Sequence, residues 1–142
     1  MRKIDEIIVH CSATPRGRNV SVADIDRWHR ERGFRCIGYH YVIGIDGTIE
    51  QGRKESETGA HCSGHNARSI GVCYAGGLSS DGKVALDTRT DAQRVAMTEL
   101  IAELRERYPG VRVYGHRDFA KKECPCFDAR REFDGGNLTQ GR

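Results

Sequence analysis

The sequence lacks long hydrophobic runs. No stretch approaches the ~20 consecutive apolar residues that a membrane helix needs, so we expect no insertion into a membrane. A secretory signal is also missing, because Asp5 and Glu6 interrupt the N-terminal segment and only the short apolar run 7–9 follows them. We therefore expect the chain to be made and kept in the cytoplasm.

The sequence also has no run of Lys and Arg with interleaved aromatic residues, which argues against nucleic-acid binding. No internal repeat or low-complexity segment is present. The net charge of +3 and pI of 8.6 describe a mildly cationic surface. Such a surface suits an anionic polymer, but an ordinary solvated surface has the same charge.

The 142 residues, of which 37% are hydrophobic and 30% charged, are typical of one soluble domain. A chain of this length buries roughly two thirds of its unfolded surface. Its six cysteines would form three disulfides in a small secreted protein. Without a signal peptide, reduced thiols are favoured, several of them buried as small apolar side chains.

Two helices are predicted from their capping residues. Ser21 has Asp24 three residues later, and apolar residues follow at helical spacing until Gly33. Thr90 and Gln93 form a full capping box at the start of a longer amphipathic helix. We expect this helix to end at Pro109 and Gly110.

Apolar runs at 7–9, 70–74 and 111–114 predict buried strands. The Asp46-Gly47 pair predicts a hairpin between an alternating run from Gly38 and a returning strand at 48–51. Strands separated by amphipathic helices indicate the α/β class, with a single-domain mixed β-sheet flanked by α-helices.

The C-terminal part of the chain is predicted to end in a short helix that Asp128 caps and that runs through Phe133. We place the domain at residues 1–133. The Gly-rich segment 134–142 is predicted to be a disordered tail.

Three residues form a candidate metal site. His10 closes the apolar run 7–9, His116 follows the run 111–114, and Cys124 lies in the loop after His116. Two strands can each present a histidine at one edge of a sheet while the loop brings the thiolate across. Three protein ligands with one open position are typical of a catalytic Zn²⁺. A rival set, His61, Cys62 and His65, lies in the polar loop 52–68, which is less able to preorganise ligands.

Six segments resemble the zinc-dependent N-acetylmuramoyl-L-alanine amidases, and more narrowly the short phage lysozymes that are amidases and the related peptidoglycan recognition proteins. They occur in family order and are VHCSAT (9–14), GYHYVI (38–43), DGTIEQGR (46–53), GAHCSGHN (59–66), SIGVCYAGG (69–77) and GHRDFAKKECPCFD (115–128).

The resemblance implies an endolysin-like monomer with one Zn²⁺ per chain. Its implied partner is peptidoglycan, in which it would cut the amide bond between the lactyl group of N-acetylmuramic acid and L-alanine. It also implies that the enzyme stays in the cytoplasm until assisted release takes it to the cell wall.

The same resemblance implies roles for four further residues. Tyr39 would hold or shuttle a proton, and Lys122 would donate to the tetrahedral oxyanion. His61 and Asn66 would line the substrate cleft. Strand alternation places Tyr39 and His40 on opposite sides, and the resemblance implies that Tyr39 is the one on the side of the site.

Departures from the wider family favour the phage-like branch. A cytosolic branch has an Asp as third ligand and a Glu as base, and this chain has Cys124 and Cys73 at those places. The alternative is a non-catalytic peptidoglycan-binding module, against which Cys124 argues. A glycosidase would need two particular carboxylates, which nothing singles out. A structural zinc protein would need a fourth ligand, and Cys11 or Cys126 are the candidates.

Overall fold

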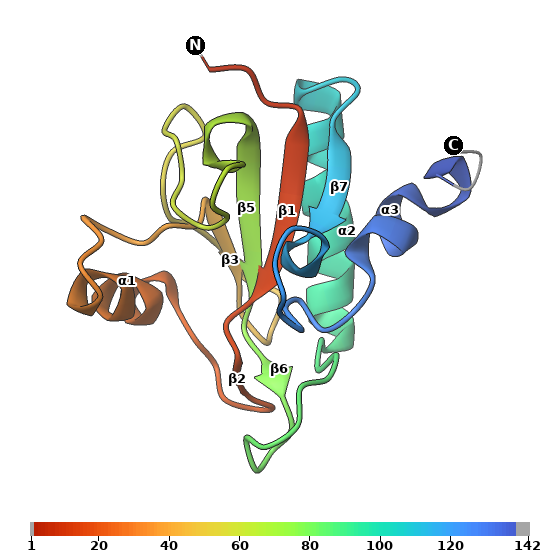
Figure 1. Ribbon diagram of the computed structural model, residues 1–142. Helices are drawn as coiled ribbons and strands as arrows, with labels where there is room; N and C mark the ends of the chain where they lie inside the picture. The colour runs from red at the N-terminus through yellow and green to blue at the C-terminus, as the bar shows by residue number, and fades with distance from the viewer. Residues whose placement is uncertain (1, 139–142) are drawn as a thin grey trace.

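The computed structural model describes residues 2–138, which form a five-stranded sheet, a two-stranded sheet and three α-helices (Figure 1). The main sheet has the order β4-β3-β5-β1-β7, in which β4 is antiparallel to β3 and the other neighbours are parallel. Its strands are β1 (Glu6–Cys11), β3 (Tyr41–Ile43), β4 (Ile49–Gln51), β5 (Ser69–Tyr74) and β7 (Arg112–Gly115). The predicted fold class, an α/β domain with a mixed sheet, is confirmed.

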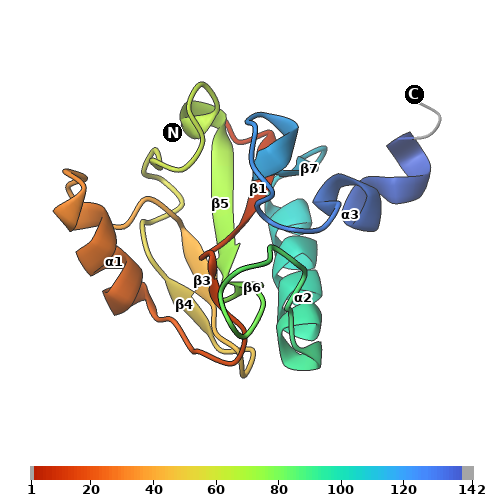
Figure 2. The ribbon, with the colours of Figure 1, turned by 60° about the horizontal axis from the view of Figure 1, so that its bottom comes forward.

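Helices α1 (Val22–Glu31) and α2 (Asp91–Arg107) lie on opposite sides of this sheet, as Figure 2 shows. Each begins at the capping box that the sequence predicts. The Ser21 hydroxyl accepts from the Asp24 backbone N–H, and the Thr90 hydroxyl accepts from that of Gln93. Both boxes satisfy amide groups that no helical turn can pair.

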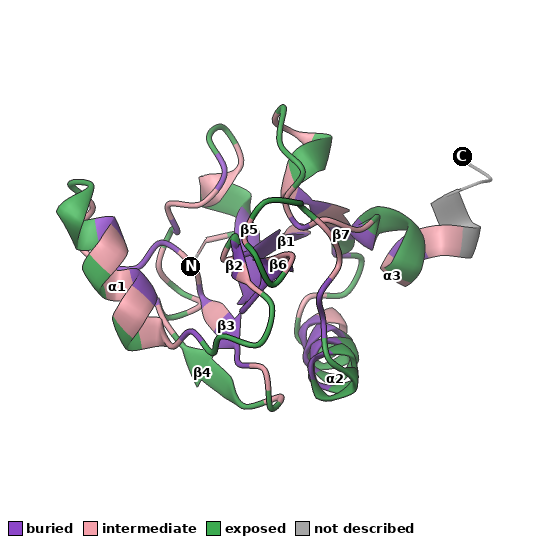
Figure 3. Ribbon diagram, turned by 90° about the horizontal axis from the view of Figure 1, so that it is seen from below, coloured by how far each residue is buried: buried purple, intermediate pink, exposed green. Residues whose placement is uncertain are grey.

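Each face of the sheet has its own core. Alternate residues of β1, Ile7, Val9 and Cys11, pack with α2 in the larger cluster. A smaller cluster around Val42 and Ile25 fills the space between the sheet and α1. The buried segments in Figure 3 follow this division, since the central strands are buried while α1 and α2 each keep an exposed outer side. His10 is on the opposite side of β1 from the larger core, so it faces α1.

The second sheet is small and was not predicted. Strand β2 (Thr14–Pro15) pairs in parallel with β6 (Gly77–Leu78). Each strand has two residues, too few for a hydrophobic period to be visible. The sheet joins the loops that follow β1 and β5, at the end of the main sheet where the candidate ligands lie.

Helix α3 (Ala129–Leu138) extends beyond the predicted end at Phe133. Asp134 is buried, and its carboxylate accepts from the backbone N–H of Val113 at 2.8 Å and from Arg105 at 2.6 Å. The expected domain boundary at 133 therefore falls inside a packed helix. The rest of the expected tail, residues 139–142, lies outside the described residues.

The predicted strand from Gly38 is also shorter than expected, because β3 starts at Tyr41. Tyr41 and Ile43 pack on the α2 side, whereas Tyr39 packs with Val42 on the α1 side. Strict alternation from Gly38 would put Tyr39 and Tyr41 on the same side of the sheet, and it fails here because residues 38–40 are not regular strand.

Within the described residues, no helix combines the length and the apolar character needed to cross a membrane.

Candidate functional site

The carboxyl ends of β1 and β7 bring the two candidate histidine ligands together. The parallel register places Val9 of β1 opposite Gly115 of β7, so the next residues along the two strands are His10 and His116. Their ring centroids are 4.6 Å apart. His10 is buried in the middle of the sheet, and His116 begins the short 3-10 helix η2 (His116–Asp118).

Cys124 completes this group. Single ligand atoms from His10, His116 and Cys124 all lie within 4.8 Å of one another, and no other set of this kind exists in the described part of the chain. The Sγ of Cys124 is 3.9 Å from Nδ1 of His10. This separation is close to what two imidazoles and a thiolate need around one ion, because Zn–N and Zn–S bonds of about 2.0 and 2.3 Å put tetrahedral ligand atoms about 3.3 to 3.5 Å apart.

Close packing against the end of β7 holds the loop that carries Cys124. A Cβ at Gly115 would lie 2.8 Å from Cδ of Pro125, so only glycine lets the loop approach this closely. The hydroxyl of Tyr74 donates to the Pro125 carbonyl at 2.7 Å. The backbone N–H of Cys11 points at the Cys124 sulfur, 3.2 Å away, and would stabilise negative charge on it.

The electrostatics of the site favour neutral imidazoles, the form that binds metals. Burial lowers the pKa of His10 well below its ordinary value, and the repulsion that a protonated His10 would meet from His61, His116 and Lys122 acts in the same direction. Burial and then the charge of Lys122 lower the pKa of His116. Lys122 lines the space next to His116 and Cys124.

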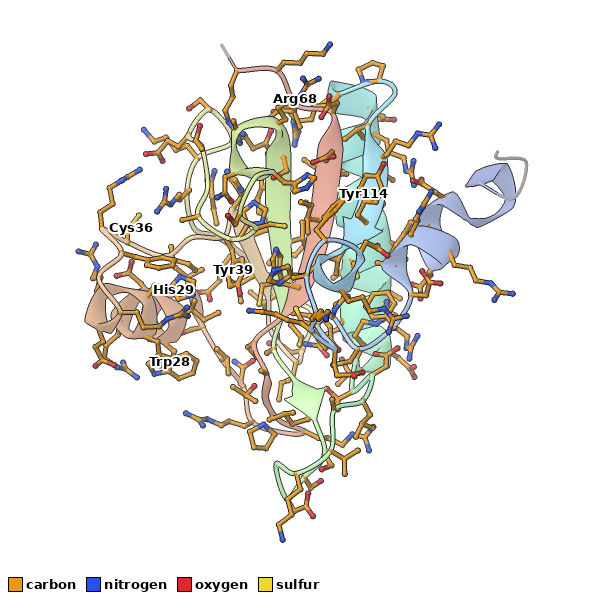
Figure 4. The ribbon with its side chains drawn as sticks, in the orientation of Figure 1. Trp28, His29, Cys36, Tyr39, Arg68 and Tyr114 are labelled. Carbon is orange, nitrogen blue, oxygen red and sulfur yellow. The ribbon has the colours of Figure 1, made fainter. Side chains whose placement is uncertain are left out.

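Tyr39 lies beside His10, with the ring centroids 4.8 Å apart. Burial raises the pKa of its hydroxyl well above the ordinary value, and the thiols of Cys73 and Cys124 add to the effect. The hydroxyl therefore remains a proton donor at neutral pH. Figure 4 shows Tyr39 and His29 between α1 and the sheet.

His29 also lines the cleft, although it is not among the candidate residues named from the sequence. It is buried, its Nδ1 accepts from the Gly38 N–H at 2.9 Å, and its ring lies 5.4 Å from that of Tyr39. One signal was available, because His29 follows the buried Ile25 by four residues and so shares its helix face.

His61 contacts a candidate ligand directly. Its Nδ1 is 2.8 Å from Nε2 of His10, and its Nε2 is 3.1 Å from the hydroxyl of Ser69. Burial lowers the pKa of His61 to about 3, with a smaller effect from the charges of His40 and His116. The amide oxygen of Asn66 accepts from the backbone N–H groups of His61 and Cys62, at 2.8 and 2.9 Å, and so shapes the loop.

The rival metal set is not assembled. His65 pairs with Glu6 at 3.0 Å and stacks on Phe119, away from His61. Cys62 is buried and is not grouped with either histidine as a metal site.

The site opens into a cleft made of two adjoining hollows of ≈ 250 and ≈ 290 Å³. His29, Arg32, Tyr39, His116 and Lys122 line both, while the second extends over His61 and Asn66. Arg32 was not predicted as a cleft residue. No Asp or Glu is among the described residues that line either hollow, so the cleft has cations and imidazoles but no carboxylate.

Comparisons with known proteins all indicate peptidoglycan amidases and phage endolysins. A family model described as N-acetylmuramoyl-L-alanine amidase matches residues 1–127. The endolysin of Escherichia phage T7 is 42% identical over 135 residues, which covers 95% of this chain and 89% of the relative. The endolysin of Klebsiella phage KP32 is 39% identical over 138 residues, with coverage of 97% and 91%.

Solved structures show the same likeness. The N-acetylmuramoyl-L-alanine amidase LysC from Clostridium intestinale superposes with a TM-score of 0.79 at 28% identity, covering 97% of this chain and 87% of that one. Drosophila PGRP-LB superposes with a TM-score of 0.78 at 27% identity, covering 96% and 82%.

Proposed function

Because this chain belongs to the family of N-acetylmuramoyl-L-alanine amidases, we propose that it works with one Zn²⁺ held by His10, His116 and Cys124. The enzyme hydrolyses the amide bond between the lactyl group of N-acetylmuramic acid and L-alanine in bacterial peptidoglycan, as an endolysin. The observation that carries the metal proposal is the convergence of three ligand atoms within 4.8 Å, next to a hollow that His116 and Cys124 line.

The donor set fits zinc. Two imidazoles and one thiolate are N and S ligands of the kind that Zn²⁺ prefers, and three protein ligands leave one position open for catalysis. The surroundings keep both imidazoles neutral, and the N–H of Cys11 supports charge on the sulfur. When bound, the ion would supply a Lewis acid that lowers the pKa of a water to about 7 and polarises the scissile carbonyl.

Lys122 is proposed as the donor that stabilises the oxyanion of the tetrahedral intermediate. It lines both hollows of the cleft and lies two residues before Cys124. Lys122 is exposed beside the cleft, and its ammonium would interact more strongly with developing negative charge once bound substrate excludes water than it does in bulk water. Among the described residues that line the cleft, there is no carboxylate to neutralise it.

Tyr39 is proposed to position the attacking water and transfer a proton. Its hydroxyl is kept protonated by burial, and its ring contacts His10. Positioned proton transfer of this kind contributes about 10² to 10⁴ in rate. Asn66 and His61 border the same hollow, where the stem peptide and sugar would lie.

Two observations argue against the competing activities. A glycosidase needs a pair of carboxylates on either side of the bond, and the described cleft residues include none. A non-catalytic recognition module does not need a metal site, whereas all three candidate ligands are present and adjacent here.

The test is to incubate the purified protein with peptidoglycan and measure new amino groups and new reducing ends in parallel. We expect amino groups only, lost with a chelator and restored by Zn²⁺. Cys124→Ser should lose the zinc and the activity. Cys36→Ser is the matched control, because Cys36 is a free thiol that contacts Ile37 and is not part of the site. Reducing ends, or full activity after complete metal removal, would refute the zinc mechanism.

We further propose that the enzyme acts as a monomer and reaches the cell wall from the cytoplasm only after release. The relatives' identity as phage endolysins supports this route. Sedimentation of the zinc-loaded protein tests the first point, because a dimer at assay concentration would contradict it. Fractionation of expressing cells before and after lysis tests the second.

A further inference from the structure

The two ring nitrogens of His10 have different neighbours. Nδ1 lies on the side of the candidate metal site, 3.9 Å from the sulfur of Cys124. Nε2 points the other way and is 2.8 Å from Nδ1 of His61. A neutral imidazole has one N–H and one lone pair, so these two contacts constrain each other.

The proton positions follow from this geometry. For Nδ1 of His10 to offer its lone pair to a metal, the proton must be on Nε2, which then donates to Nδ1 of His61. His61 must in turn have its proton on Nε2, where the Ser69 hydroxyl is 3.1 Å away and accepts it. One arrangement of protons therefore satisfies all three side chains and leaves the correct nitrogen of His10 free.

The chain also makes room for the His61 ring. A Cβ at Gly71 would lie 2.8 Å from Cδ2 and Cγ of His61, and a Cβ at Gly59 would lie 2.7 Å from Cδ2. Gly71 is a buried residue of β5, and Gly59 is in the loop that covers that strand. The His61 ring thus packs closely against the backbone at both glycines, and this packing limits the orientations that the ring can adopt beside His10.

We propose that His61 is a positioning residue for the metal ligand His10, which it orients and holds as the tautomer with the proton on Nε2. The inference rests on the proposed zinc site and adds to it, because His61 then acts through His10 as well as bordering the substrate hollow. The other N–H of a metal-bound histidine is usually donated to a carboxylate, a backbone carbonyl or water. In this chain an imidazole, itself oriented by a serine, takes that place.

The test compares zinc affinity across variants at two histidines of the same loop region. We expect His61→Ala to weaken zinc binding about 10- to 100-fold, measured by competition with a chromogenic chelator. His61→Asn should recover most of that loss, because its Oδ1 occupies nearly the position of Nδ1 and can accept from His10. His65→Asn is the matched control and should bind zinc as the wild type does, since His65 contacts Glu6 and Phe119 instead.

A second readout does not depend on zinc or activity. Long-range ¹⁵N–¹H spectra of the metal-free protein should show the proton on Nε2 of both His10 and His61, and His61→Ala should lose that single tautomer at His10. A proton on Nδ1 of His10 in the wild type would overturn the proposal.

The outcomes also separate this inference from the function it rests on. Unchanged zinc affinity in His61→Ala together with a raised KM would show that His61 only contacts substrate, and would overturn the positioning role alone. Failure of the wild type to bind zinc at all would overturn the metal proposal itself.

Discussion

Replacing Tyr39 by Phe should separate catalysis from stability. The change removes one hydroxyl and leaves the ring contacts with His10 and His29 in place. No hydrogen bond joins this hydroxyl to another residue of the described chain, and its raised pKa comes from burial and nearby thiols. The free energy of unfolding should therefore stay unchanged or rise by up to about 1 kcal/mol, because removing an unpaired polar group from a half-buried place recovers a desolvation cost.

The expected effect on the reaction is much larger. Loss of a positioned proton donor should lower kcat by about 10² to 10⁴, which corresponds to about 2.7 to 5.4 kcal/mol in the activation barrier. Zinc affinity should stay the same, since Tyr39 is not one of the three ligands. The assays are amide hydrolysis on purified muropeptides, chelator competition for zinc, and urea unfolding of the metal-free protein.

Tyr41→Phe is the matched control, because its hydroxyl has a partner and lies outside the cleft. The Tyr41 hydroxyl donates to the carboxylate of Glu55. Removing it should cost about 1.5 to 3 kcal/mol in stability, the usual range for a hydrogen bond to a charged group, and leave kcat unchanged. The reasoning fails if Tyr39→Phe keeps activity within about threefold, or if it unfolds more easily than Tyr41→Phe.

Three further changes have distinct expected results. Lys122→Met should lower kcat about 10²- to 10³-fold while zinc binds as tightly or more tightly, since an oxyanion donor and a like charge near the metal are both removed; weaker zinc binding would contradict this. Gly115→Ala should cost about 1 to 3 kcal/mol in stability and weaken zinc binding, because its Cβ would collide with Pro125 and shift the Cys124 loop; unchanged zinc affinity would contradict it. Asp87→Asn should destabilise the fold by about 1 to 3 kcal/mol at pH 7 but hardly at all near pH 2, as measured by urea unfolding across this range. Burial alone would raise the pKa of Asp87, but hydrogen bonds from Arg89 outweigh it and lower this pKa in the folded protein. The ionised carboxylate therefore stabilises the fold at any pH above its pKa in the unfolded chain, about 4, and this stabilisation is lost as the pH falls through the pKa of the folded state. If wild type and Asp87→Asn differ in stability by the same amount down to pH 2, the role of this charge is refuted.

Local signals predicted the helices and the hairpin well. The capping boxes at Ser21 and Thr90 depend on residues three apart, and the Asp46-Gly47 turn depends on two neighbours, so their physics is contained in the sequence window. Helix α3 was predicted too short because its stability comes from a distant contact. Asp134 is held by Arg105 and by the backbone of Val113, and no local pattern reports such a contact.

The candidate ligands were predictable for a different reason. His10 and His116 each follow an apolar run, and parallel strands that pair in register bring their carboxyl ends to one edge of a sheet. That argument needs only the strands and their direction. The role of His61 needs more, because it depends on how loop 52–68 folds back over β5. The trace of that packing in the sequence is glycine at 59 and 71, and the two become meaningful only once the structure shows the His61 ring close to both.

The three ligands should also differ in how firmly the fold holds them. His10 is in a central strand, paired on both sides by β5 and β7, and its second ring nitrogen is fixed by His61. Cys124 is in a loop that is held by the contact of Pro125 with Gly115 and by the Tyr74 hydroxyl. Local opening costs less where fewer backbone hydrogen bonds and apolar contacts must break. We therefore expect hydrogen exchange of the metal-free enzyme to be fast around Cys124 and slow at His10, with zinc slowing exchange mainly in the loop. Equal protection of both segments without zinc would show that the loop is as rigid as the sheet and that the metal binds a fully preformed site.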